Sequence, residues 1–346
     1  MTVNVGFLGA GIAASWHLEN LVAMEEVRVA ALCDTAEGKA ASMAAQYGGQ
    51  PYTRYEEMLD KENLDALYIC LPPFAHTEQE IAAAERGIHL LVEKPVTLDP
   101  QQGRRVAEAI EWAGIISSSG YHWRYYNTVN RLQEVLAERP IGMVLGRWMG
   151  GIWDAPWWKD RAKSGGQIIE QIGHFFDLLR YLLGEVQSVS GGLSHRGLIT
   201  DVEGYNLDDV STVNLRFENG VIANVSATCM VQRGYSLQMD FLGRRLVLEL
   251  TMGQLRIADG DKVTVVENQV SSKLPSHFAA LDRTFIEAVR RGDGSRIRSP
   301  YADALRTLDL VLAVQRSIDA GETVVLHSEG TGMIPSPSDD EESTCL

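Results

Sequence analysis

The sequence predicts two domains: an α/β domain built on a doubly wound parallel sheet, then an α+β domain built on a mainly antiparallel, open sheet. Strand-like and helix-like segments alternate up to about residue 121, and a glycine-rich turn joins the first strand to the first helix. Beyond that point several strand-like segments follow one another directly. Alternation is typical of parallel βαβ units, and a succession of strands is typical of an antiparallel sheet.

In the first domain, short apolar runs predict the strands, and the segments between them predict the helices. The strands are expected at residues 3–8, 27–33, 66–71, 88–92 and 115–120, and the helices at 12–24, 36–47, 54–60, 76–86 and 100–113. The run 66–71 is apolar throughout, as in a strand covered on both faces. Right-handed crossovers between such strands give a parallel sheet with helices on each side.

The second domain begins with a helix at 127–138, a strand at 142–150, an aromatic-rich loop and a long helix at 167–183. Seven strands are then expected at 186–197, 209–217, 221–231, 235–242, 245–250, 254–258 and 262–267. Asn219-Gly220 is a hairpin turn signal between two of them. Helices at 277–290 and 302–320 close the pattern, which places the domains at 1–121 and 122–330.

Composition and charge limit the class of protein. A length of 346 residues agrees with two domains, and a net charge of −15 argues against nucleic acid and anionic membranes as partners. The four cysteines are scattered without metal-binding spacing, so no metal site is expected. The acidic segment 331–346 is expected to be disordered. No apolar run could cross a bilayer and no signal peptide is evident, which predicts a cytoplasmic protein.

The turn after the first strand has the pattern of a dinucleotide-binding site. Gly9 permits a tight turn, and Gly11 lets a pyrophosphate approach the backbone because it has no Cβ. The helix beginning at Ile12 and Ala13 directs unpaired N–H groups at the phosphates. Asp34 can accept both ribose hydroxyls and repel a 2′-phosphate, which predicts NAD. A Gly-x-Gly turn alone also fits a tight turn without a ligand; the strand–helix–strand–acid context favours the nucleotide.

Two further segments end predicted parallel strands, where ligands of such sheets bind. Leu71, Pro72 and His76 belong to a proline-stiffened turn that we expect beside the cofactor, although a plain turn before a helix explains them equally well. Glu93 and Lys94 follow the fourth strand, where the nicotinamide half should reach. We expect the lysine to contact the nicotinamide ribose and the substrate hydroxyl and to stabilise negative charge there. Ordinary solvated charge is the alternative.

The segment 164–177 combines glycines with polar residues on an otherwise apolar helix. Glu170 and His174 stand four residues apart and are expected on one helix face, with Asp177 three residues further along. Buried polar groups need partners or a cavity. Three interpretations stay open: a core histidine held by an acid, a base tuned by a carboxylate, and a zinc site, which no further His or Cys cluster supports.

Together these segments resemble the glucose–fructose oxidoreductase, inositol dehydrogenase and rhizopine-catabolism (Gfo/Idh/MocA) family. The resemblance extends from Val3 to about Leu326. Its motifs are Gly9-x-Gly11, Asp34, Pro72-Pro73 with His76, Glu93-Lys94-Pro95, the segment 120–125 and the helix 165–177. It implies an NAD-binding Rossmann domain at 1–121 and a substrate-binding and oligomerisation domain at 122–330. It also implies a homodimer or homotetramer assembled through the second sheet.

The resemblance places the catalytic roles on Lys94 and His174. Glu170 stands where the family commonly has aspartate, and His122 stands where many members have asparagine. The expected reaction is hydride transfer between NAD and a secondary alcohol or ketone of a sugar, polyol or cyclitol. In the oxidation His174 takes the hydroxyl proton, Lys94 steadies the developing oxyanion, and Glu170 orients the substrate or His174.

An aromatic-rich surface is the expected substrate site. Trp153, Trp157 and Arg124 are its leading candidates, together with His122 and His174. Indole faces stack on the C–H face of a sugar ring, and the charged groups bind hydroxyls. Tryptophans packed under the sheet or at a subunit interface are the alternative.

Two other functions remain compatible with the sequence. One is an NAD-dependent glycoside hydrolase that oxidises its sugar transiently, and the other is a non-catalytic NAD-sensing regulator. The presence of both Lys94 and His174 argues against the regulator.

Overall fold

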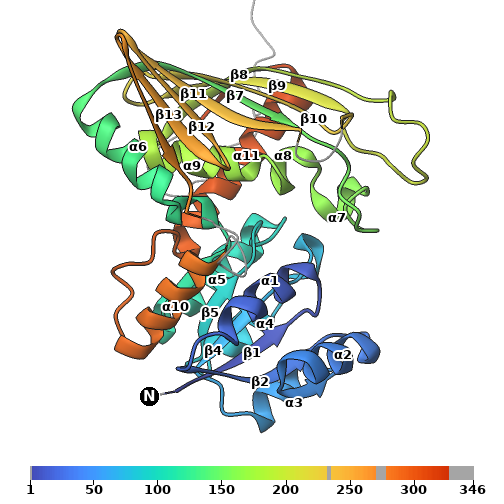
Figure 1. Ribbon diagram of the computed structural model, residues 1–346. Helices are drawn as coiled ribbons and strands as arrows, with labels where there is room; N and C mark the ends of the chain where they lie inside the picture. The colour runs from blue at the N-terminus through green and yellow to red at the C-terminus, as the bar shows by residue number, and fades with distance from the viewer. Residues whose placement is uncertain (1, 232–234, 270–277, 327–346) are drawn as a thin grey trace, which may run out of the picture.

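The computed structural model describes residues 2–231, 235–269 and 278–326, whose elements form two sheets with helices around them (Figure 1). The predicted fold class is confirmed: a parallel α/β sheet is followed by a mainly antiparallel one. The predicted acidic tail, 331–346, lies outside the described residues. Among those residues, no helix has the length and apolar composition that a bilayer crossing requires.

The first sheet contains six parallel strands in the order β3-β2-β1-β4-β5-β6. They are β1 (Val3–Leu8), β2 (Val27–Cys33), β3 (Gln50–Tyr52), β4 (Ala66–Ile69), β5 (His89–Val92) and β6 (Ser117–Ser119). The predicted strands are all present. The additional strand, β3, is three residues long, which is too short to display a strand period.

Helices pack on both faces of this sheet, as the apolar strands require. They are α1 (Ile12–Leu21), α2 (Glu37–Tyr47), α3 (Tyr55–Lys61), α4 (Gln79–Ala84) and α5 (Pro100–Ala113), with 3₁₀ turns η1 (Pro73–Ala75) and η2 (His122–Tyr125). The strand order reverses between β1 and β4, and ligands of doubly wound sheets bind at the carboxyl ends of strands there. The loops after β1, β4 and β5 therefore define the edge where a cofactor would bind.

Within the described residues, the second sheet has nine strands in the order β14-β13-β12-β11-β7-β10-β9-β8-β15. They are β7 (Ile141–Met149), β8 (Val186–His195), β9 (Val210–Phe217), β10 (Ile222–Thr228), β11 (Ser236–Gly243), β12 (Leu246–Thr251), β13 (Gln254–Asp259), β14 (Lys262–Glu267) and β15 (Val324–Val325). In the described ranges β7 and β10 pair in parallel, and the other neighbouring strands pair antiparallel. The two-residue strand β15 is an addition to the prediction.

One face of the second sheet is covered by helices (Figure 1). These are α6 (Asn127–Glu138), α9 (Gly173–Leu183) and α11 (Tyr301–Ala320), whose apolar residues join those of the strands in one core. Strand β9 illustrates the pattern, because Val213, Leu215 and Phe217 alternate toward that core.

The prediction of a single helix at 167–183 is wrong, because this segment forms two helices, α8 (Gln167–Glu170) and α9. At the junction the Ile172 N–H bonds the Gln167 carbonyl, five residues back, and the Phe175 N–H bonds the Ile172 carbonyl, three residues back. This departs from the regular four-residue spacing. Gly173, a poor helix former, stands at the break. Glu170 and His174 consequently lie on different helices and are oriented separately.

Helix α10 (Ala279–Arg291) belongs spatially to the first sheet, although it falls in the range 122–330. It lies beside that sheet in Figure 1. Leu281, Phe285 and Ile286 are buried in the core that contains β1 and α1. The chain therefore returns to the nucleotide half after β14, and it adds the edge strand β15 to the second sheet only after α11.

Candidate active site

The glycine loop after β1 has the backbone that a dinucleotide requires. Gly9 has φ +95°, and a Cβ there would lie 2.4 Å from the Cys70 carbonyl oxygen. Among the described residues, a Cβ on Gly11 would meet nothing within 4 Å, and no side chain caps the helix that begins at Ile12. The described part of the chain thus leaves open space at Gly11, directly before the first turn, whose N–H groups include that of Ala13. The loop fits a pyrophosphate.

The acid at the end of β2 faces this loop. Asp34 accepts hydrogen bonds from the Ala10 N–H at 2.9 Å and from the Ala36 N–H at 2.8 Å. These bonds hold the carboxylate beside the glycine turn, where an adenosine ribose would lie in this fold.

The turn after β4 adds a buried histidine to the same edge. Leu71 and Pro72 are half-buried, and η1 follows them. The Nδ1 atom of His76 lies 2.5 Å from Oε1 of Glu80, and both side chains are buried. Among the described residues, none is a hydrogen-bond partner of His76 Nε2. A buried ring nitrogen without a protein partner is suited to form a hydrogen bond with a ligand.

The lysine after β5 reaches across to the other half of the molecule. Its Nζ donates to the Glu170 carboxylate at 2.6 Å and to the Glu170 carbonyl oxygen at 2.7 Å. Both side chains are 13% exposed. Lys94, which precedes a cis bond to Pro95, therefore joins the nucleotide half to α8.

The second oxygen of Glu170 is held as well. It accepts a hydrogen bond from the indole N–H of Trp158 at 2.6 Å. Trp158 is fully buried in a small cluster with Leu207 and Cys229. The sequence placed Trp158 on the expected substrate surface with Trp153 and Trp157, and it did not reveal that Trp158 is buried, because adjacent tryptophans give no sign of which one turns inward.

His174 begins α9 within a group of aromatic rings. Its ring centroid lies 5.0 Å from that of His122, and its plane is near parallel to those of Trp123 and Trp148. His122 Nδ1 lies 3.2 Å from the Gly120 carbonyl oxygen. The two histidines are thus neighbours, as the substrate assignments require.

The two predicted indoles lie near these groups in different settings. Trp153 meets Trp16 of α1 edge to face, with centroids 6.0 Å apart. Trp157 is half-buried against the Trp158 cluster.

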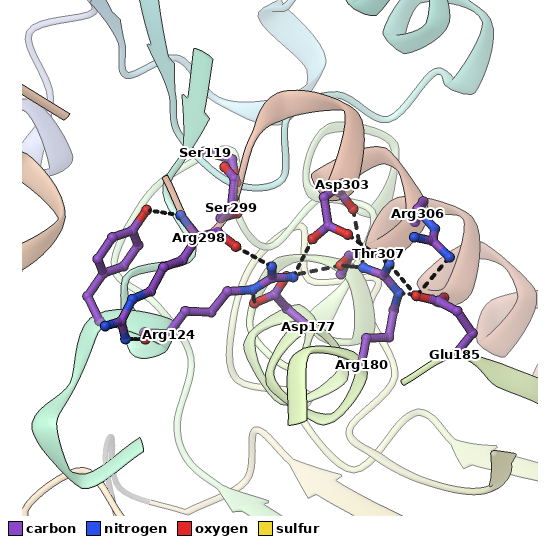
Figure 2. A network of polar contacts seen from close by, with 11 residues as sticks. Ser119, Arg124, Asp177, Arg180, Glu185, Arg298, Ser299, Asp303, Arg306 and Thr307 are labelled. Carbon is purple, nitrogen blue, oxygen red and sulfur yellow. Dashed lines mark hydrogen bonds and ion pairs between the residues drawn. The ribbon is translucent and has the colours of Figure 1, made fainter. Parts of the chain in front are cut away.

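The structure corrects the expectation that Arg124 binds substrate. The guanidinium is buried and donates to both Asp177 oxygens, at 2.8 and 2.5 Å, and to the Arg298 carbonyl oxygen at 2.6 Å. It also pairs with Asp303 of α11 at 2.7 Å. Figure 2 shows Arg124 between these carboxylates. Its donors are committed to the protein.

The same network removes Asp177 from the suggested zinc trio. Burial raises the pKa of Asp177, and the nearby guanidinium groups of Arg124 and Arg180 oppose that shift. Arg180 continues the network to Glu185 and Thr307 (Figure 2). In the part of the chain that the structure describes, three or more His, Cys, Asp or Glu side chains are nowhere grouped for a metal ion.

Glu93 also differs from the expectation, because its carboxylate is engaged within the protein. One oxygen accepts the Lys94 backbone N–H at 3.0 Å, and the other lies 3.1 Å from Nε2 of His17 in α1. Sequence reasoning did not find His17, whose partners come from distant segments.

Comparison with known proteins agrees with this arrangement. Residues 3–121 match a family described as an oxidoreductase family with an NAD-binding Rossmann fold, and residues 131–249 match the GFO/IDH/MocA C-terminal domain. The chain belongs to the Gfo/Idh/MocA family. It is therefore an NAD-dependent oxidoreductase with the family's two domains.

Individual relatives cover nearly the whole chain. It is 25% identical to myo-inositol 2-dehydrogenase of Thermotoga maritima, over 94% of this chain and 99% of that one. It is 27% identical to scyllo-inositol 2-dehydrogenase (NAD(+)) of Bacillus subtilis, over 94% and 96%. Among solved structures, levoglucosan dehydrogenase in complex with NADH shares the fold, with a TM-score of 0.84, 18% identity and coverage of 94% and 99%.

Replacing Asp34 by Asn is expected to reduce the preference for NAD⁺ over NADP⁺ by about tenfold, because the charge that repels a 2′-phosphate is lost. Dissociation constants for both cofactors, measured by calorimetry, check this. Glu85→Gln, which removes an exposed charge at the end of α4, is the matched control. A parent protein that binds NADP⁺ more tightly would contradict the assignment of Asp34.

Replacing Arg124 by Met is expected to destabilise the protein by about 3–5 kcal/mol, because Asp177 then stays buried without its partner. The urea midpoint of unfolding measures this. Arg131→Met removes an exposed pair with Glu134 and should cost about 0.3–0.5 kcal/mol. A stable Arg124→Met variant with a raised substrate KM would restore the substrate role.

Proposed function

We propose that the protein is a dehydrogenase that oxidises or reduces a secondary alcohol carbon of a sugar, polyol or cyclitol with NAD(H). The contact between Lys94 and Glu170 carries this proposal, because it brings a cation from the cofactor edge onto the substrate half. The two inositol dehydrogenases among the relatives support the substrate class.

The residues that would hold NAD line the edge formed by β1, β2 and β4. Gly9, Gly11, Ile12 and Ala13 would receive the pyrophosphate, and Asp34 the adenosine ribose. When bound, the nicotinamide supplies the hydride acceptor or donor.

A further set would lie along the nicotinamide half. Leu71 and Pro72 shape the turn there, and the Nε2 atom of His76 is oriented by Glu80. Lys94 ends the neighbouring strand, beyond the engaged carboxylate of Glu93.

Three side chains would do the remaining chemistry. His174 takes the hydroxyl proton in the oxidation and returns it in the reduction. The Lys94 ammonium stabilises the negative charge that develops on the substrate oxygen. Glu170, with one oxygen on Lys94 and the other on Trp158, holds that ammonium in place. The extra methylene of a glutamate at this position gives it the reach to join both partners.

The substrate would lie between His174 and the aromatic loop. His122 neighbours His174, and Trp153 approaches α1 from the second domain. Together with Trp157 these groups offer ring faces for C–H surfaces and imidazole nitrogens for hydroxyls.

A panel of inositols, other polyols and aldoses, incubated with NAD⁺ and followed at 340 nm, tests the function. We expect NADH to accumulate with at least one cyclic polyol. His174→Ala should lower kcat by roughly 10²–10⁴-fold because the general base is lost. His195→Ala, which removes an exposed histidine on β8, is the control. Cleavage of a glycoside without NADH accumulation would replace this proposal with redox-assisted hydrolysis.

We also propose that a second copy of the chain covers the outer face of the second sheet. Strand register places a row of apolar residues across that face: Ile222, Met143, Leu242, Val247, Ala258 and Val263. Met143, Ile222 and Val263 are 37%, 44% and 51% exposed, whereas their strand neighbours Val144 and Ala223 are buried. Exposed apolar surface of this kind is typical of an interface.

Light scattering should give the mass of a dimer or tetramer for the parent protein. Met143→Asp is expected to shift it toward the monomer, because a carboxylate would be buried in the interface without a partner. Met252→Asp, at an exposed methionine outside the row, should leave the assembly unchanged. A monomeric parent protein would exclude this interface.

A further inference from the structure

A buried histidine of α1 lies between two carboxylates from distant parts of the chain. His17 is fully buried; its Nδ1 lies 2.5 Å from Oδ1 of Asp282 in α10, and its Nε2 lies 3.1 Å from Oε1 of Glu93. The other Asp282 oxygen accepts the side-chain N–H of Asn20 at 2.5 Å. This arrangement links the helix of the glycine loop, the strand end that carries Lys94, and α10.

The imidazole of this group is a cation at neutral pH. Burial alone would lower the pKa of His17, but Asp282 and Glu93 outweigh it and raise that pKa to about 10. An imidazolium donates from both ring nitrogens, so it bonds both carboxylates at once.

Glu93 connects this group directly to Lys94. Its second oxygen accepts the Lys94 backbone N–H at 3.0 Å. Gly120 provides the room, because a Cβ there would lie 2.4 Å from the Glu93 carboxylate. The direction in which Lys94 leaves the strand end is thereby fixed from the His17 side, while Glu170 holds its Nζ from the opposite side.

Aromatic rings enclose the imidazolium and exclude water. Its ring centroid lies 5.2 Å from that of Tyr68 and 4.7 Å from that of Phe278. Apolar side chains would join α1 to α10 at lower cost, because buried ion pairs are often less stabilising than hydrophobic packing. A charged imidazole that hydrogen-bonds a carboxylate from each ring nitrogen adds a fixed orientation of those carboxylates.

We propose that His17 and Asp282 are positioning residues that act through Glu93 to fix Lys94 for the reaction. This inference rests on the proposed catalytic role of Lys94. It assigns a function in the dehydrogenase to α10, which follows β14 of the second sheet in sequence and packs on the first sheet.

Two variants of the same residue separate positioning from packing. In His17→Asn the amide nitrogen takes the place of Nδ1, so the hydrogen bond to Asp282 is kept and the hydrogen bond to Glu93 is lost. In His17→Gln the amide takes the place of Nε2 and keeps Glu93. Both remove the imidazole and its charge. We expect kcat to be lower in the Asn variant than in the Gln variant by roughly 10- to 100-fold, with similar NAD Kd values.

The second measurement needs no substrate. Acetic anhydride labels lysines of the full-length, NAD-bound protein, and mass spectrometry follows Lys94 against exposed Lys163 as an internal reference. Lys94 should be labelled faster in His17→Asn than in His17→Gln. Glu93→Asp, which keeps the charge but withdraws the carboxylate, should release Lys94 in the same way if His17→Asn does not fold. His89→Asn, at the other end of β5, is the control.

Equal kcat values and equal Lys94 labelling in the two His17 variants would overturn the proposal and leave His17 a packing residue. If Lys94 labelling differs between the two variants but the parent protein turns over none of the tested polyols, the positioning of Lys94 by His17 is supported and only the proposed function is refuted.

Discussion

The contact between Lys94 and Glu170 is the interaction on which the candidate site depends. It joins an ammonium and a carboxylate that are both largely removed from water, and their attraction is therefore stronger than that of a surface pair. The same burial also makes the pair sensitive to separation, because either charge left buried without its partner would strongly destabilise the protein. The two halves of the molecule must consequently keep one relative arrangement, at least at this point.

Two buried ionic groups provide that constancy. The first joins Arg124 of η2 to Asp177 of α9 and Asp303 of α11, so the end of the first sheet is tied to the helices beneath the second. The second joins α1, the end of β5 and α10 through His17. Apolar packing holds helices against sheets but tolerates sliding, whereas charged groups that make two hydrogen bonds each fix the relative orientation of the elements they join. The His17 group ends at Glu93, next to Lys94, and the Arg124 group includes Asp177, which lies in the same helix as His174.

The absence of a Cβ at three glycines shapes the candidate site as much as the buried charges do. Gly9 and Gly120 stand where a Cβ would collide with a carbonyl or a carboxylate, and Gly11 leaves open space over the start of α1. The first two let protein groups approach one another, and the third leaves room for a ligand. A glycine pattern in the sequence does not distinguish these cases, because the atom that would collide comes from another part of the chain.

Local sequence was sufficient for the parallel sheet, the positions of the antiparallel strands along the chain, the glycine loop with Asp34 and the placement of Lys94 at a strand end. Those features follow from periods of two and 3.6 residues and from conformations open mainly to glycine, which short segments encode. The break before Gly173, the burial of Trp158 and the capture of Arg124 by Asp177 depended on tertiary packing. So did the pairing of His17 with Asp282, which are 265 residues apart. Such partners are selected by burial, because a charge removed from water must find an opposite charge wherever the fold brings one, and no local pattern specifies which one it meets.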